Sequence, residues 1–182
     1  MAAASPTNLA EEILEQIGVN MFIKTRAPAH QVNTVFLKIR FDQIPEPVYA
    51  IIEIIDGRKV ITVPSKAEVK KYESYLTKSN WGGGSKICGY DIKAGFLSEC
   101  YRDCNFTFAF FSKRTRKSLS LRNNLSRNSL NIVLCGFIMM TIAMSRQNVP
   151  YLYIDNVCSL GGLGKMLMDV AYNMLGITNI DE

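Results

Sequence analysis

The first part of the chain alternates between a helical pattern and a β pattern. In residues 5–18, apolar residues recur at helical spacing and Gly18 follows as a C-terminal stop, which predicts a short amphipathic helix. Residues 30–41 ("HQVNTVFLKIRF") are rich in β-branched and aromatic types and predict a strand. The chain is therefore predicted to open with a helix followed by a strand.

A hairpin and a second helix are predicted next. "VYAIIEIIDGRKVITV" (48–63) contains two β-rich runs around Asp56-Gly57, a pair that tolerates the positive φ angles of a type I′ turn. Pro64 and Ser65 then open a helix. One face of that helix carries Val69, Tyr72 and Leu76. A loop is expected at "GGGS" (82–85).

Three further strands are predicted in the second half. Residues 105–114 ("NFTFAFFSKR") read as a strand, and a long polar and basic connection follows at 112–129. Residues 131–142 form a nearly continuous apolar strand, 143–150 a turn, and 151–159 another strand. Apolar residues then recur at helical spacing before Gly176, a stop; they are Leu163, Leu167, Val170 and Met174.

Length and composition indicate one folded unit. The 182 residues, 48% hydrophobic and 20% charged, are ordinary for a globular domain. We expect a single domain over 1–182, with a helix, hairpin and helix portion at 1–79 and a sheet portion at 105–176. The predicted fold is α+β: a mostly antiparallel sheet flanked by helices, with an N-terminal helix and hairpin.

The sequence favours an intracellular protein without a membrane span. Its N-terminus is small and acidic rather than basic and then apolar, unlike a secretory signal. The apolar run 131–144 is shorter than the roughly 20 residues of a spanning helix. An odd number of cysteines suggests reduced thiols and a cytoplasmic or nuclear location. The five are Cys88, Cys100, Cys104, Cys135 and Cys158.

Positive charge is concentrated in one segment. The net charge is +5, and no acidic residue occurs between Asp103 and Asp155. The cationic residues there are Lys113, Arg114, Arg116, Lys117, Arg122, Arg127 and Arg146. Three interpretations remain open: a solvated loop, an electrostatic contact with a protein or a nucleic acid, and help in binding a phosphorylated ligand. Interleaved aromatics are missing, so any nucleic-acid contact would be through the backbone and salt-sensitive.

The stretch from Asn156 to Gly176 places a glycine-rich turn between a strand and a helix. Such a turn directs free N–H groups of the first helical turn at an anion, and glycines let the anion approach. A Walker A loop is excluded because Ser159 and Met166 stand at its glycine and Ser/Thr positions. The dinucleotide fingerprint fails at Leu167. A purely structural tight turn is the alternative.

This stretch resembles the GNAT superfamily of acetyl-CoA-dependent N-acetyltransferases. In that family a strand pair enters a Gln/Arg-x-x-Gly-x-Gly/Ala loop, and the following helix holds the CoA pyrophosphate. Gly162 and Gly164 match the two small-residue positions, and the similar region spans 131–175. The resemblance implies acetyl-CoA as cofactor and an unknown amine as acceptor. It implies cofactor contacts at Asn156, Val157, Ser159, Leu160, Gly161, Gly162, Leu163, Gly164 and Lys165.

The sequence departs from the family in two places. Ser159 stands where Gln or Arg is usual, and only "ITNIDE" follows the last helix, where the family continues with a fifth strand, a helix and a Tyr-containing segment. The cleft would then need another chain, a rearranged N-terminal part or further residues to supply its missing wall.

No catalytic residue is assigned from the sequence. Asp155 is the carboxylate nearest the predicted cofactor site, and an outward-facing or turn-stabilising role is favoured for it. Cys158 is interpreted as a small buried side chain rather than a nucleophile, and His30 as a surface or core residue. Cys100 and Cys104 lack the paired spacing of a zinc site, so no metal is expected.

Two functional hypotheses follow from these patterns. The first is an acetyl-CoA-dependent N-acetyltransferase-like protein. The second is a non-catalytic, acetyltransferase-like subunit of a larger assembly, such as a virion or a nucleoprotein complex. In either case we expect the chain to belong to a complex or an oligomer.

Overall fold

The computed structural model describes residues 33–41, 46–55, 58–77, 94–113, 132–160 and 162–176, together with Glu12. Some of the sequence-based expectations lie outside these residues. They concern the N-terminal helix apart from Glu12, His30, the turn residues Asp56 and Gly57, the loop at 82–85, Cys88, the part of the basic connection at 114–129, and Gly161.

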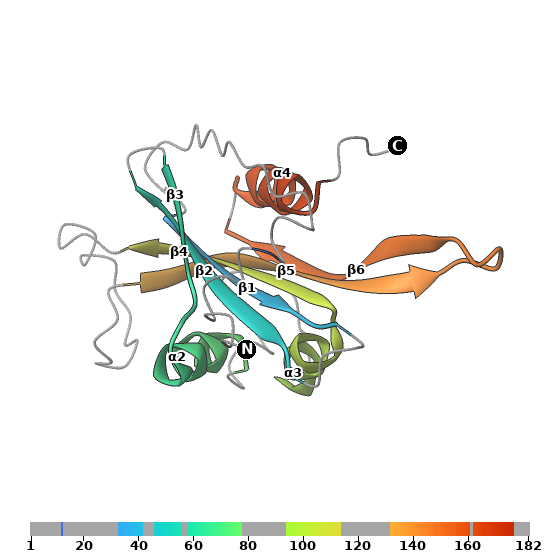
Figure 1. Ribbon diagram of the computed structural model, residues 1–182, viewed down its shortest axis with the longest axis horizontal. Helices are drawn as coiled ribbons and strands as arrows, with labels where there is room; N and C mark the ends of the chain where they lie inside the picture. The colour runs from blue at the N-terminus through green and yellow to red at the C-terminus, as the bar shows by residue number, and fades with distance from the viewer. Residues whose placement is uncertain are drawn as a thin grey trace, which may run out of the picture.

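Six strands form one sheet in the order β3-β2-β1-β4-β5-β6, and every neighbouring pair is antiparallel (Figure 1). The strands are β1 (Thr34–Ile39), β2 (Val48–Ile55), β3 (Arg58–Thr62), β4 (Phe106–Lys113), β5 (Ile132–Met144) and β6 (Pro150–Ser159). β3 and β6 are therefore the two edge strands of this sheet.

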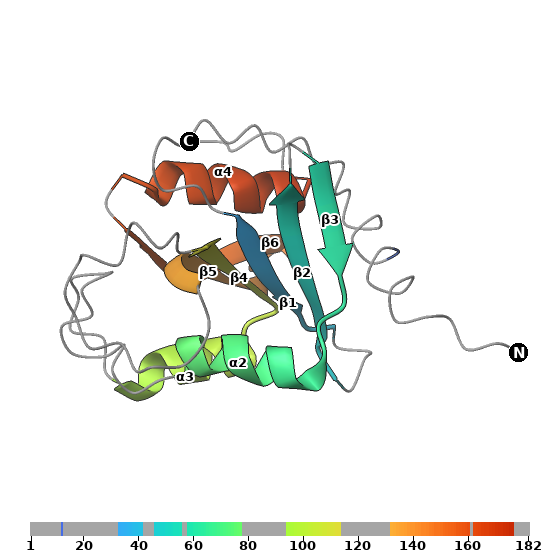
Figure 2. The same cartoon turned by 90° about the vertical axis from the view of Figure 1, so that its left-hand side faces the viewer.

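Helices cover both faces of the sheet. α2 (Lys66–Leu76) and α3 (Ala94–Asp103) lie on one face, and α4 (Gly164–Met174) lies on the other, as Figure 2 shows. The described part of the chain is thus an α+β fold with an antiparallel sheet, which confirms the predicted class at that level.

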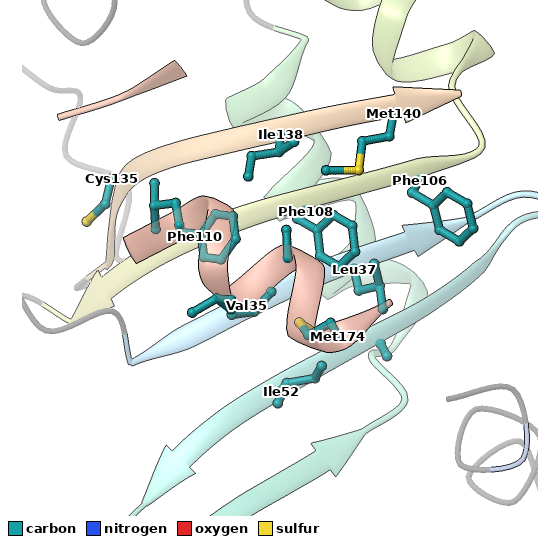
Figure 3. Close-up of a cluster of buried hydrophobic side chains, with 14 of the residues drawn as sticks. Val35, Leu37, Ile52, Phe106, Phe108, Phe110, Cys135, Ile138, Met140 and Met174 are labelled. Atoms are coloured by element: carbon teal, nitrogen blue, oxygen red, sulfur yellow. The ribbon is translucent and has the colours of Figure 1, made fainter. Parts of the chain in front are cut away.

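Two apolar clusters hold these layers together. Figure 3 shows the cluster under α4, in which Phe108 and Phe110 of β4 lie beside Val35 of β1 and Met174 of α4. On the other face, Phe36 of β1 stacks on Tyr72 of α2, with ring centroids 5.0 Å apart. β1 is buried on both faces because it lies in the middle of the sheet, with helices above and below.

The predicted hairpin and second helix are confirmed. β2 and β3 pair in the register that places Ile55 opposite Arg58, on either side of Asp56-Gly57. α2 begins after Ser65, whose hydroxyl accepts from the Glu68 N–H at 3.3 Å while the Glu68 carboxylate accepts from the Ser65 N–H at 2.9 Å. This reciprocal capping box explains why the helix starts there.

α3 was not predicted from the sequence. Its buried positions are Leu97, Tyr101 and, just beyond its end, Cys104. That spacing of four and three residues is a helical signal, although it spans only two turns. The helix matters for the site because its C-terminal end lies close to β6, where Cys104 contacts Asp155.

A buried lysine fixes the C-terminal end of α3 to the sheet. Lys38 of β1 is only 3% exposed, and its Nζ donates to the carbonyl oxygens of Tyr101 and Arg102. The same Nζ lies 3.9 Å from the centroid of the Tyr101 ring. A cation beside the last carbonyls of a helix also complements the helix dipole.

A carboxylate on α2 extends this polar cluster. Glu73 Oε1 accepts from the Tyr49 hydroxyl at 2.7 Å and from the Tyr101 hydroxyl at 2.8 Å, which joins β2, α2 and α3. Burial, followed by the proximity of Arg40, lowers the pKa of Lys38 to about 8. Burial is also the main reason that the pKa values of Tyr49 and Tyr101 are raised.

We expect the free energy of unfolding to depend on pH because the pKa of Lys38 is lowered in the folded state. Its pKa of about 8 in the folded state is below the ordinary 10.5. Between these values the unfolded chain binds more protons, so the free energy of unfolding rises with pH. Chemical denaturation between pH 7 and pH 9.5 should show the wild type gaining stability relative to Lys38→Met. A difference that stays constant with pH would contradict this assignment.

Candidate functional site

The turn between β6 and α4 has the backbone geometry that requires glycine. Gly162 has a φ of +81°, and a Cβ there would have no heavy atom within 4 Å. Conformation, rather than space, therefore demands glycine at this position. The helix that follows buries the predicted face, because Leu163, Leu167, Val170 and Met174 are all buried.

The first turn of α4 presents N–H groups with no acceptor in the described part of the chain. They belong to Gly164, Lys165 and Met166. No side chain caps this end, and its first turn carries no acidic residue. These N–H groups and the positive end of the helix dipole favour an anion just beyond the turn.

Two other N–H groups of the predicted site are already engaged. The Leu160 N–H donates to the Cys135 carbonyl at 2.8 Å, and the Leu163 N–H donates to the Leu160 carbonyl at 3.1 Å. The first of these bonds continues the β5–β6 ladder, in which Gly136 pairs with Ser159, by one more residue on each strand. The resemblance implied donors from Leu160 through Lys165. Of these, Gly161 lies outside the described residues, and the N–H groups of Gly162, Gly164 and Lys165 have no acceptor among the described residues.

A glycine in β5 allows the turn to lie close to the sheet. A Cβ added at Gly136 would lie 2.6 Å from the Cys158 carbonyl oxygen and 3.0 Å from Ser159 Cα, and would also overlap Leu167 Cδ1. Gly136 was not singled out from the sequence. It lies in a continuous apolar run, which gave no indication that the β6 backbone and Leu167 of α4 approach it closely.

A bulge of the sheet lies in β6, at Asp155. Met139 pairs with Asn156 and Met140 with Ile154, so Asp155 is left outside the ladder. Its Oδ2 accepts from Thr141 Oγ1 at 2.5 Å and from Cys104 Sγ at 3.3 Å. Asp155 is therefore half-buried and held from β5 and the end of α3, rather than facing outward.

The Cys104 thiol is a donor at neutral pH. Burial is the main cause that raises its pKa to about 12, and the hydrogen bond to Asp155 adds to this effect. Asn156, next to the bulge, has a buried Nδ2 without a partner among the described residues, whereas Val157 is 42% exposed. These two residues lie on the edge strand, where the outer backbone groups of β6 face no other described strand.

The cysteines correct one expectation. Cys158 is buried and disulfide-bonded, so the interpretation of all five as reduced thiols is wrong for this residue. Cys100, Cys104 and Cys135 carry thiols. A disulfide-bonded sulfur is not a nucleophile, which agrees with the structural interpretation of Cys158.

Comparison of the chain with protein-family models, with curated proteins and with solved structures finds no match. Within the described ranges, no helix is long and apolar enough to span a bilayer. The same residues contain no group of three His, Cys, Asp or Glu side chains that could hold a metal ion. The features of the described residues that bear on function are therefore the turn before α4 and the edge strand β6.

Proposed function

We propose that this chain binds acetyl-CoA as an N-acetyltransferase-like protein, with the CoA pyrophosphate at the N-terminus of α4. The observation that carries the proposal is the set of N–H groups of Gly164, Lys165 and Met166, which follow a positive-φ glycine and lack acceptors among the described residues. Lys165 adds an exposed cation at the same end. Phosphate oxygens are the acceptors that such an arrangement favours.

The edge of β6 supplies the second part of the proposal. The pantetheine arm carries amide groups, which can pair with the outer backbone groups near Asn156 and Val157 as an added strand would. The bulge at Asp155 interrupts the ladder at the point where the thioester would lie. A backbone N–H released by a bulge is the kind of donor that a tetrahedral oxyanion needs.

Lys165→Glu provides a test that separates ligand binding from folding. A carboxylate in the first turn favours the helix, so the free variant should keep its melting temperature. The same carboxylate repels a pyrophosphate. Acetyl-CoA and ADP should each stabilise the wild type and so raise its melting temperature. At a ligand concentration one hundred times Kd, the free energy of unfolding increases by about 2.7 kcal/mol. Neither ligand should raise the melting temperature of Lys165→Glu.

Lys165→Gln is the matched control, because it removes the cation without adding a negative charge. Acetyl-CoA should still raise the melting temperature of Lys165→Gln, but by less than it raises that of the wild type. The proposal is contradicted if the wild type shows no shift at millimolar acetyl-CoA, or if Lys165→Glu responds as strongly as the wild type.

The non-catalytic alternative is favoured by a different observation. Asp155, the carboxylate nearest the proposed thioester position, is occupied by hydrogen bonds from Thr141 and Cys104. The melting temperature of a binding protein without turnover would rise with acetyl-CoA, yet the protein would release no free CoA in the presence of amine acceptors. That pair of results would favour the alternative.

A further inference from the structure

The end of the β5–β6 hairpin extends beyond the helices that cover the rest of the sheet. Figure 1 shows this hairpin projecting to one side of α3 and α4. Its side chains are exposed on both faces: Tyr151 (48%) and Tyr153 (54%) on one, Ile142 (51%) and Met144 (58%) on the other. Large apolar side chains gathered on both faces of one projection indicate a contact surface.

The two edges of the sheet differ in how they are protected. β3 is only five residues long, and a short edge strand discourages pairing with another chain. β6 is ten residues long, and its single charged residue, Asp155, is turned toward Thr141 and Cys104. Pro150 and the bulge at Asp155 limit pairing at the two ends of this stretch, whereas Tyr151 to Ile154 between them carry no charge, so their outer backbone groups can accept another strand.

We propose that two copies of this chain associate through their β6 strands, antiparallel across a twofold axis beside Leu152. The sequence of this edge is self-complementary under that operation. Tyr151 of one copy then lies opposite Tyr153 of the other copy, and the two Leu152 residues lie opposite each other. The two aromatic pairs share the sheet face opposite Leu152, because Leu152 packs with the cluster under α4.

A second copy fits this edge for two reasons. An isologous contact needs a patch that matches itself, and the Tyr-Leu-Tyr order about Leu152 provides one. No like charges face each other between Pro150 and Ile154, and cross-strand aromatic pairs add to the backbone hydrogen bonds. The bulge at Asp155 ends the regular ladder, so the pairing stops before Asn156 and Val157. This inference is therefore independent of the proposed function.

Sedimentation equilibrium of the full chain over the micromolar range tests the association. The wild type should be a dimer. Tyr151→Lys combined with Tyr153→Lys should weaken association by at least about tenfold, because like charges directly opposite across strands destabilise the pair. Val60→Lys is the matched control: Val60 is 39% exposed on the opposite edge strand, β3, and its replacement should leave the dimer unchanged.

Mixed cross-linking tests the register. Tyr151→Cys and Tyr153→Cys proteins should form a disulfide-linked dimer when mixed, and each alone should give only the wild-type background. A monomeric wild type, a dimer that survives both Lys substitutions, or a dimer lost equally with Val60→Lys would overturn the proposal. Self-linking of each single variant with no gain on mixing would overturn the twofold at Leu152.

Discussion

Replacing Gly136 with alanine should lower the free energy of unfolding by about 3 kcal/mol, the upper range for overpacking a core. The added Cβ would lie 2.6 Å from the Cys158 carbonyl oxygen and 3.0 Å from Ser159 Cα. These are backbone atoms of β6 and cannot rotate away as the end of a flexible side chain can. The strand, the turn and Leu167 must therefore move together.

Urea denaturation measures this effect, and Gly95→Ala is its control. Gly95 lies in α3, where an added Cβ would have Glu99 Oε1 as its nearest contact, at 4.0 Å. Alanine favours a helix over glycine, so Gly95→Ala should be neutral or stabilising by up to about 1 kcal/mol. Equal stability of Gly136→Ala and the wild type would show that β6 and α4 do not approach β5 as closely as described.

Replacing Leu167 with alanine should cost between about 2 and 5 kcal/mol of stability. Leu167 is fully buried in the cluster between α4 and the sheet, and it lies against Gly136. Truncation leaves a cavity under the first turns of α4, which loosens the helix whose N–H groups form the candidate anion site. Ligand affinity should therefore fall together with stability.

The exposed position Asn173 on the same helix provides the comparison. Asn173→Ala should stay within about 0.5 kcal/mol of the wild type, as is usual for surface substitutions. Thermal melts of both variants, with and without ADP, give the stability and the ligand response in one experiment. A Leu167→Ala protein as stable as Asn173→Ala would contradict the packing of α4.

Local signals were sufficient to predict the six described strands and two of the described helices. Asp56-Gly57 located the β2–β3 hairpin, and Ser65 located the start of α2. The spacing of Leu163, Leu167 and Val170 located the buried face of α4. These features depend on backbone preferences and on periodicity within one segment, which a single sequence displays directly.

Features that depend on distant segments were not predictable. α3 has a short apolar pattern, and its stability depends on a sheet whose other strands come before and after it. A lysine in a strand ordinarily faces solvent, yet Lys38 is covered because α3 ends above it. The engagement of the Leu160 N–H by the Cys135 carbonyl likewise depends on strand pairing. The donors left without acceptors were therefore identifiable only from the fold.

The most direct test of the central claim is to record amide chemical shifts of the labelled protein during titration with ADP and then with acetyl-CoA. The largest changes should occur at the N–H groups of Gly164, Lys165 and Met166. The Leu160 N–H, which already donates to Cys135, should change less. Saturable changes with this distribution would place the pyrophosphate at the N-terminus of α4. Changes confined to other residues, or none at millimolar ligand, would contradict the claim.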